Sequence, residues 1–167
     1  MRAALFATVC MFGLAMAAPA QTWKVQNDLA HDKYKYDHAD NAVDGAKALV
    51  KLGREEYLAA RQAIDDGKTD AAFQFLSDYN NQAVATHEAL LKTAVDAEKH
   101  SNGFRQLQIS VRERERELRE LMSRVEFDRR QPFEDLEKAL DVLNQKLIQE
   151  LFPNLPANKQ SKKAGNP

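Results

Sequence analysis

The sequence predicts an all-α protein built as an antiparallel bundle of long amphipathic helices. The 167-residue chain has only six Gly and five Pro, too few turn residues for a β-sandwich or barrel. Its bias toward Ala, Leu, Glu, Lys, Arg and Gln favours long helices. Apolar residues recur at steps of three and four, which is the spacing of one helix face. We expect one bundle domain over residues 37–152, with helices at about 37–66, 70–100, 104–130 and 132–152.

Residues 1–20 are predicted to be a secretory signal peptide. A positively charged start precedes an uncharged apolar run over 3–14, and Ala18-Pro19-Ala20 fits a small-residue cleavage site. A membrane anchor is disfavoured because a span needs about 20 apolar residues. We therefore expect a secreted or periplasmic protein, cut after Ala20, with no membrane span in the mature chain.

The only cysteine, Cys10, lies inside this predicted signal peptide. The mature chain would then have no thiol, which excludes disulfides and thiolate zinc sites. Helix packing must supply its stability.

Residues 21–36 are predicted to form an arm of uncertain structure. This arm and the start of the next segment hold two histidines seven residues apart, His31 and His38, with Asp residues among them. On a helix the two imidazoles would lie near one face, where with a carboxylate they could bind a divalent metal. The same composition is typical of a solvated polar face, so we assign no metal ligand and no cofactor. Divalent-metal binding or sensing through His31 and His38 remains the alternative function.

The first helix, 37–66, has an apolar stripe in which Gly53 takes one position. The other members of the stripe are Val43, Ala46, Val50, Tyr57, Ala60 and Ile64. Because Gly53 shares the phase of the stripe, we expect it to let a backbone or an aromatic ring come close. Gly67 is placed to end this helix and Thr69 to cap the next one, which makes an αα-hairpin.

The second helix, 70–100, has the most regular stripe in the chain. Its members are Ala72, Leu76, Tyr79, Ala83, Thr86, Leu90, Ala94 and Ala97. We expect this helix to end near Ser101-Asn102-Gly103, which reads as a second Gly-containing stop.

The third helix, 104–130, has a thinner stripe that is interrupted by the alternating charges of residues 112–117. The apolar members are Phe104, Leu107, Val111, Leu118, Leu121, Met122 and Val125. Ion pairs four residues apart are expected to support a solvated helix here. The expected pairs are Glu115 with Arg119, Arg116 with Glu120, and Glu120 with Arg124. The alternative is a docking surface, because Arg is enriched at interfaces and in anion recognition.

The fourth helix, 132–152, follows a basic, Pro, acidic order of residues that is typical of one helix ending and another beginning. A single Pro-kinked helix over 104–152 is the alternative. The apolar stripe of this helix consists of Phe133, Leu136, Leu140, Leu143, Leu147 and Leu151. It must be covered, by fold-back or by a second copy, and we favour fold-back because an intramolecular contact has the higher effective concentration. Residues 153–167 are predicted to be a disordered basic tail.

The chain contains no recognisable catalytic, cofactor or nucleic-acid motif. His87-Glu88 begins like a zinc-protease helix, but Leu91 stands where the second histidine is required. A formal net charge of −1 disfavours a nucleic-acid partner. The sequence therefore predicts an exported, non-catalytic binding, scaffold or chaperone-like protein, with an enzyme of unknown type as the third alternative. A protein partner or self-association would use the Arg-rich third helix or the Leu136–Leu151 stripe.

Overall fold

The computed structural model describes residues 19–154 and shows an all-helical chain, which confirms the predicted fold class. The elements are α1 (Pro19–Asp37), α2 (Ala42–Asp65), α3 (Thr69–Lys92), α4 (Asn102–Met122), a 3₁₀ helix (Phe127–Arg129) and α5 (Gln131–Leu151). Residues 1–18 of the predicted signal peptide and 155–167 of the predicted tail lie outside the described residues. Over the described part of the chain, no helix combines the length and apolar character needed to cross a bilayer.

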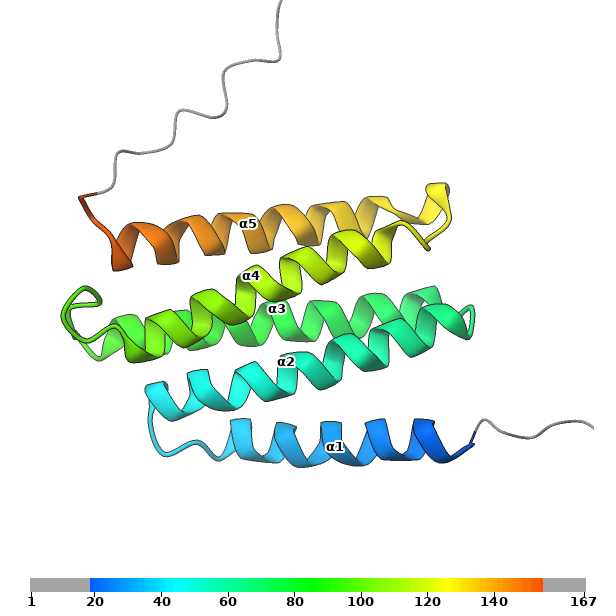
Figure 1. Cartoon of the computed structure of the whole chain (residues 1–167), viewed down its shortest axis with the longest axis horizontal. Helices are drawn as coiled ribbons and strands as arrows, with labels where there is room; N and C mark the ends of the chain where they lie inside the picture. The colour runs from blue at the N-terminus through cyan, green and yellow to red at the C-terminus, as the bar shows by residue number, and fades with distance from the viewer. Residues whose placement is uncertain (1–18, 155–167) are drawn as a thin grey trace, which may run out of the picture.

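Helices α2 to α5 form a bundle in which successive helices run in opposite directions (Figure 1). Helix α2 packs against α3 and α4, and α5 completes the bundle by packing against α4 and α3. Helix α1 lies along the outer side of α2 (Figure 1). The bundle therefore has one core, and α1 is a fifth, peripheral helix.

The predicted stripes of α3 and α5 form the centre of this core. All six predicted residues of α5 are buried, as are those of α3 as far as Leu90. From α4, the buried stripe residues are Phe104, Leu107, Val111, Leu118 and Leu121, and Val125, just after this helix, is buried as well. The apolar stripe of residues 136–151 is thus covered by its own chain, so it is not available as an association surface.

Gly53 allows the ring of Tyr79 on α3 to come close to α2, as predicted. A Cβ atom at Gly53 would lie 2.7 Å from Cδ2 of Tyr79 and still closer to Cε2. The Tyr79 ring is 1% exposed, and its hydroxyl shares a 2.8 Å hydrogen bond with Ser110 on α4. The missing side chain therefore sets the distance between α2 and α3.

Three predicted helix boundaries were wrong. Helix α2 begins at Ala42 rather than residue 37, because Asn41 caps it. Helix α3 ends at Lys92 rather than residue 100, and the exposed Ala94 has a left-handed φ of 54°, which cannot continue a helix. Helix α4 ends at Met122 rather than residue 130.

The predicted stop at residues 101–103 was also wrong, because Asn102 and Gly103 form the first turn of α4. Gly103 lies there against Leu90, where an added Cβ would be 2.5 Å from Cδ2 of that side chain. At the other end of α4, the chain turns through the 3₁₀ helix before α5 begins at Gln131. Helices α4 and α5 therefore form a hairpin, and a continuous Pro-kinked helix is excluded.

The segment left uncertain by the sequence, residues 21–36, is helical as part of α1. The reason lies in α2, which buries a second row of residues outside the predicted stripe. This row consists of Gly45, Leu52, Glu56, Ala59 and Ala63. The row faces α1, because Val25 and Leu29 of α1 line one hollow together with Ala59 and Ala63.

Replacing Asn41 by alanine is expected to destabilise the protein by about 1 kcal/mol. The Asn41 side-chain oxygen accepts hydrogen bonds from the backbone amides of Val43 and Asp44, both at 3.0 Å. Alanine leaves both amides without this acceptor. Urea unfolding monitored by circular dichroism measures the difference. Asn41→Ser serves as the control, because serine keeps a capping acceptor without placing a second carboxylate beside Asp44, to which the Asn41 amide donates at 2.7 Å. Equal losses in the two variants would contradict the capping role.

Candidate binding surface on α4

The charged run of α4 is divided between the core and the surface. Arg114 and Glu115 are only 6% and 5% exposed, whereas Arg112 and Arg116 are exposed. The helical period places residues 114 and 115 on the inward face, between the turns of Val111 and Leu118. The prediction that the whole run is solvated was therefore wrong.

The buried side chain of Arg114 connects α4 to α2. Its Nε lies 2.9 Å from Oε2 of Glu117, close enough for an ion pair although not aligned for a hydrogen bond. Its guanidinium lies over the ring of Tyr57 on α2, 5.8 Å from the ring centroid. A cation in this position is attracted by the negative face of the ring. Burial raises the pKa of Glu117, and the charge of Arg114 opposes this shift.

Glu115 and Arg119 join α4 to α5. Asn144 of α5 donates a 3.4 Å hydrogen bond to Glu115, and Gln108 donates one of 3.0 Å to Asn144. Arg119 pairs with Glu115, as predicted, and also with Glu137 of α5 at 2.9 Å. Hydrogen bonds to Glu137 and Glu115 raise the pKa of Arg119. This arginine is therefore occupied within the chain.

The two other predicted pairs, Arg116 with Glu120 and Glu120 with Arg124, do not form among the described residues. Arg124 instead pairs with Asp65 at the end of α2, 3.3 Å away. Arg124 pairs with Asp65 and not with Glu120, because the end of α2 lies next to the end of α4. Arg116 is left free for other contacts.

Three free arginines share one exposed face of α4. Arg105, Arg112 and Arg116 form no ion pair with any residue that the structure describes, and spacings of seven and four place them on the side opposite the core. Ile109, which lies between them, is 39% exposed. We call these four residues the arginine face.

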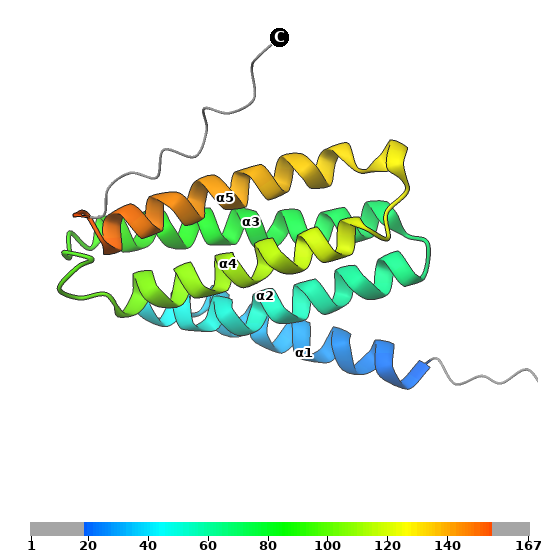
Figure 2. The same ribbon diagram turned by 45° about the horizontal axis from the view of Figure 1, so that its top comes forward.

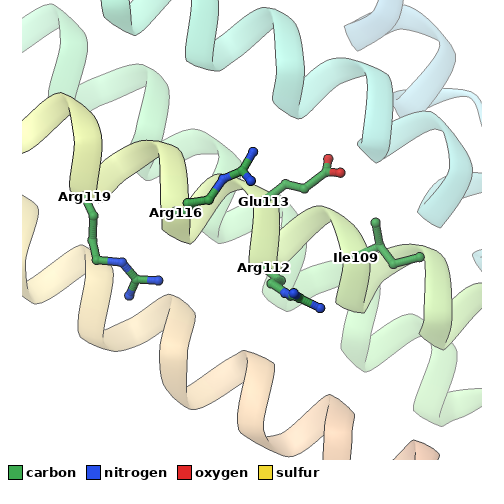
Figure 3. Close-up of a pocket in the computed structure, with 5 residues that line it drawn as sticks. All are labelled: Ile109, Arg112, Glu113, Arg116 and Arg119. Carbon is green, nitrogen blue, oxygen red and sulfur yellow. The ribbon is translucent and has the colours of Figure 1, made fainter.

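A shallow pocket lies on this face and is shown in Figure 3. Its lining consists of Ile109, Arg112, Glu113, Arg116 and Arg119, all from α4. The side chain of Arg119 extends toward α5, whereas Glu113 and Arg116 rise on the side of α2 (Figure 3). The pocket therefore has guanidinium groups on both flanks of the helix, of which Arg119 is already paired with Glu115 and Glu137.

The arginine face is suited to carboxylates. A guanidinium donates two parallel hydrogen bonds to one carboxylate, which a lysine ammonium cannot do. Arg116 follows Arg105 by eleven positions, which is about 16 Å along the helix, so the three cations can meet several acidic side chains of one partner. Ile109 adds an apolar contact in the middle.

The histidines considered as metal ligands lie on the exposed surface at the C-terminal part of α1. His38 stacks on Tyr34 with 4.0 Å between ring centroids, and its Nδ1 lies 2.9 Å from the Tyr34 carbonyl oxygen. His31 is exposed. Within the described residues, no three or more His, Cys, Asp or Glu side chains come together as a metal site.

His87, the residue that begins the incomplete zinc-protease pattern, has a place in the bundle. It is 7% exposed, and its Nε2 lies 2.9 Å from Oε1 of Glu150 on α5. Glu88 and Leu91 are exposed on the outer side of α3. The pair of His87 and Glu150 therefore joins α3 to the end of α5.

A second hollow lies at the end of the bundle near the connection between α3 and α4. Its walls include Val43, Val95 and Phe104, and Lys99 and His100 lie at its rim. Lys99 is paired with Asp96 at 3.5 Å. This hollow therefore offers fewer free charges than the arginine face.

The comparisons with known proteins found no match: no protein-family model, no curated protein and no solved structure is significantly similar to this chain. Among the surfaces of residues 19–154, the arginine face combines free charge, exposure and a hollow. It is the candidate functional site.

Proposed function

We propose that this protein is an exported, non-catalytic binding protein that holds an acidic segment of a partner protein on the arginine face of α4. One observation carries the proposal: three neighbouring arginines on one exposed face have no ion-pair partner among the described residues. Most other arginines near α4 are occupied, by Glu117, Glu137, Asp65 and Asp70. Charge complementarity therefore favours an acidic partner at this face.

The long helices support a scaffold role for this surface. The rows of buried residues on α2, α4 and α5 hold α4 rigidly, so the arginines are presented in fixed register. The alternative function, metal binding by His31 and His38, has less support because no further His, Cys, Asp or Glu side chain of the described residues completes a metal site with them.

The triple variant Arg105→Gln, Arg112→Gln, Arg116→Gln is expected to weaken binding of an acidic polypeptide about tenfold or more. Each exposed charge pair contributes about 0.2–1 kcal/mol, and tenfold corresponds to about 1.4 kcal/mol. The measurement is fluorescence anisotropy of labelled poly-L-glutamate with the purified protein. Binding by the wild type should weaken when the ionic strength rises from about 50 to 150 mM, because salt screens exposed charges.

The matched control is the variant Lys51→Gln, Lys92→Gln, Lys146→Gln, which removes the same charge from exposed positions outside the arginine face. It should bind poly-L-glutamate nearly as the wild type does. Equal losses in the two triple variants would show that overall charge, and not the arginine face, governs binding. Single-stranded DNA of equal charge that binds as tightly as the polypeptide would also contradict the proposal.

A further inference from the structure

Helix α1 packs mainly on one helix, α2, whereas each of the other helices packs on at least two. From residue 24 onward none of its side chains is buried, and its inner side is formed by half-buried residues. These are Val25, Asp28, Leu29, Asp32 and Tyr36. Both views show the ribbon of α1 diverging from α2 toward its N-terminal end (Figures 1 and 2). The side chains of residues 24–37 are therefore less deeply buried than those of the other four helices.

The part of α2 beneath α1 lies at the edge of the main core. Leu52 is fully buried and Ala59 is 8% exposed, yet neither belongs to the core cluster formed by α2 to α5, whereas Ala63 does. From α1, Tyr36 packs against this cluster. Removing α1 would therefore uncover the second row of α2 and take only this one aromatic contact from the core.

Among the described residues of α1, Tyr36 makes the side-chain hydrogen bonds to the bundle. Its hydroxyl donates to the backbone oxygen of Gln82 at 3.0 Å and lies 3.0 Å from Oγ1 of Thr86, both on α3. The side chain of Gln82 in turn donates a 2.9 Å hydrogen bond to Oε1 of Glu56 on α2. Gln82 therefore connects the anchor of α1 to a carboxyl group.

This carboxyl group is in an unusual position. Glu56 is 3% exposed, and its second oxygen, Oε2, is buried without a hydrogen-bond partner in the structure. An ionised carboxylate in such a place loses its hydration and receives only one hydrogen bond in return. A neutral carboxyl group tolerates the site far better.

The charges that face Glu56 do not reverse this preference. Burial raises the pKa of Glu56 to about 8, and the negative charge of Asp78 on α3 adds to this shift. The Gln82 hydrogen bond and the positive charge of Lys33 on α1 lower the pKa, but by less than burial raises it. Two tyrosines, Tyr36 of α1 and Tyr79 of α3, also lie near Glu56, and burial raises the pKa of each. The one nearby cation is therefore too weak to keep Glu56 ionised at neutral pH.

A second carboxyl group of α2, that of Glu55, also disfavours docking of α1 when it ionises. The pKa of Glu55 is raised, chiefly by burial and then by the negative charges of Asp28 and Asp32 on α1. The positive charges of Arg54 and Lys24 oppose this shift. Acidic groups thus meet across the interface of α1 and α2. Their ionisation repels α1 from the bundle.

We propose that α1 is a displaceable cover, docked on α2 while Glu56 is neutral and released when Glu56 ionises. The sign follows from linkage. In the released state Glu56 meets water and ionises near its ordinary pKa of 4.5, whereas in the docked state it keeps its proton up to about pH 8. Docking is therefore strongest below pH 4.5, weakens by up to about tenfold per pH unit as pH rises, and levels off above pH 8.

Hydrogen exchange of the purified protein between about pH 5 and 8, corrected for intrinsic exchange rates, tests this proposal. In the wild type, protection of α1 relative to α5 should fall with rising pH by several-fold to tenfold per unit. Glu56→Gln, which copies the shape of the neutral carboxyl, should keep α1 protected across the range. Glu88→Gln, an exposed carboxyl on α3, should behave as the wild type does.

Tyr36→Phe is the second variant, and it removes the anchoring hydroxyl without altering Glu56. It should lower α1 protection at every pH while keeping the pH dependence. Wild-type protection that does not change with pH would overturn the proposal, and so would an equally steep dependence in Glu56→Gln. The arginine face is not involved, so either proposal can fail without the other.

Discussion

Replacing Leu140 by aspartate is expected to unfold the bundle. Leu140 is 2% exposed in the centre of the α5 stripe. An unpaired carboxylate buried there costs several kcal/mol. This is comparable with the whole stability of a small domain, which is about 5–15 kcal/mol. Circular dichroism should show that most of the helical signal is lost at 25 °C or that the melting temperature falls steeply.

The matched control is Val142→Asp, two residues further along the same helix. Val142 is 53% exposed, so its replacement should change the free energy of unfolding by less than about 0.5 kcal/mol. Light scattering should accompany both measurements. A Leu140→Asp protein that stays fully folded and only loses self-association would mean that the stripe is an intermolecular surface.

Replacing Gly53 by valine is expected to destabilise the protein by about 3 kcal/mol, the upper part of the usual range for overpacking. The new side chain must displace the ring of Tyr79, which is 1% exposed and hydrogen-bonded to Ser110. Moving the ring would separate α2 from α3 or break this hydrogen bond. Urea unfolding of the two proteins measures the loss.

A double-mutant cycle with Tyr79→Leu separates the steric effect from the helix preference of valine. With the ring gone, Gly53→Val should cost much less than in the wild type, so the two changes should show a coupling of about 1 kcal/mol or more. Additive losses would show that the contact between Gly53 and Tyr79 does not limit the packing. Gly53→Ala should destabilise the protein less than Gly53→Val does, because alanine has a smaller side chain and a higher helix propensity than glycine.

Burial of polar groups explains why the candidate site was only partly predictable. The sequence indicated an Arg-rich segment and one correct ion pair, Glu115 with Arg119. It did not show that Arg114 points into the bundle. An arginine between Val111 and Leu118 can lie in the core or extend into solvent, and the sequence of one helix does not distinguish the two. The ring of Tyr57, from a helix about 60 residues earlier in the chain, makes the inward position favourable.

Helix α1 shows the same limit for secondary structure. Residues 24–37 bury no side chain fully, so their own pattern contains little helical signal. The signal lay in α2, where the row of Leu52, Ala59 and Ala63 runs beside the predicted stripe. A helix with two buried rows needs neighbours on two sides, and α1 is the second neighbour.

The sequence by itself determined the fold class, the α3 stripe to Leu90, the whole α5 stripe and the role of Gly53, because helix periodicity is a local property of the chain. Only the tertiary structure decided where α3 and α4 end, that α4 and α5 form a hairpin, and which charges of α4 remain free. These features depend on partners distant in sequence: Asp65 for Arg124, Tyr57 for Arg114 and Glu137 for Arg119. The free energy of burying or pairing a charge is set by those neighbours, and the order of residues along one helix does not specify them.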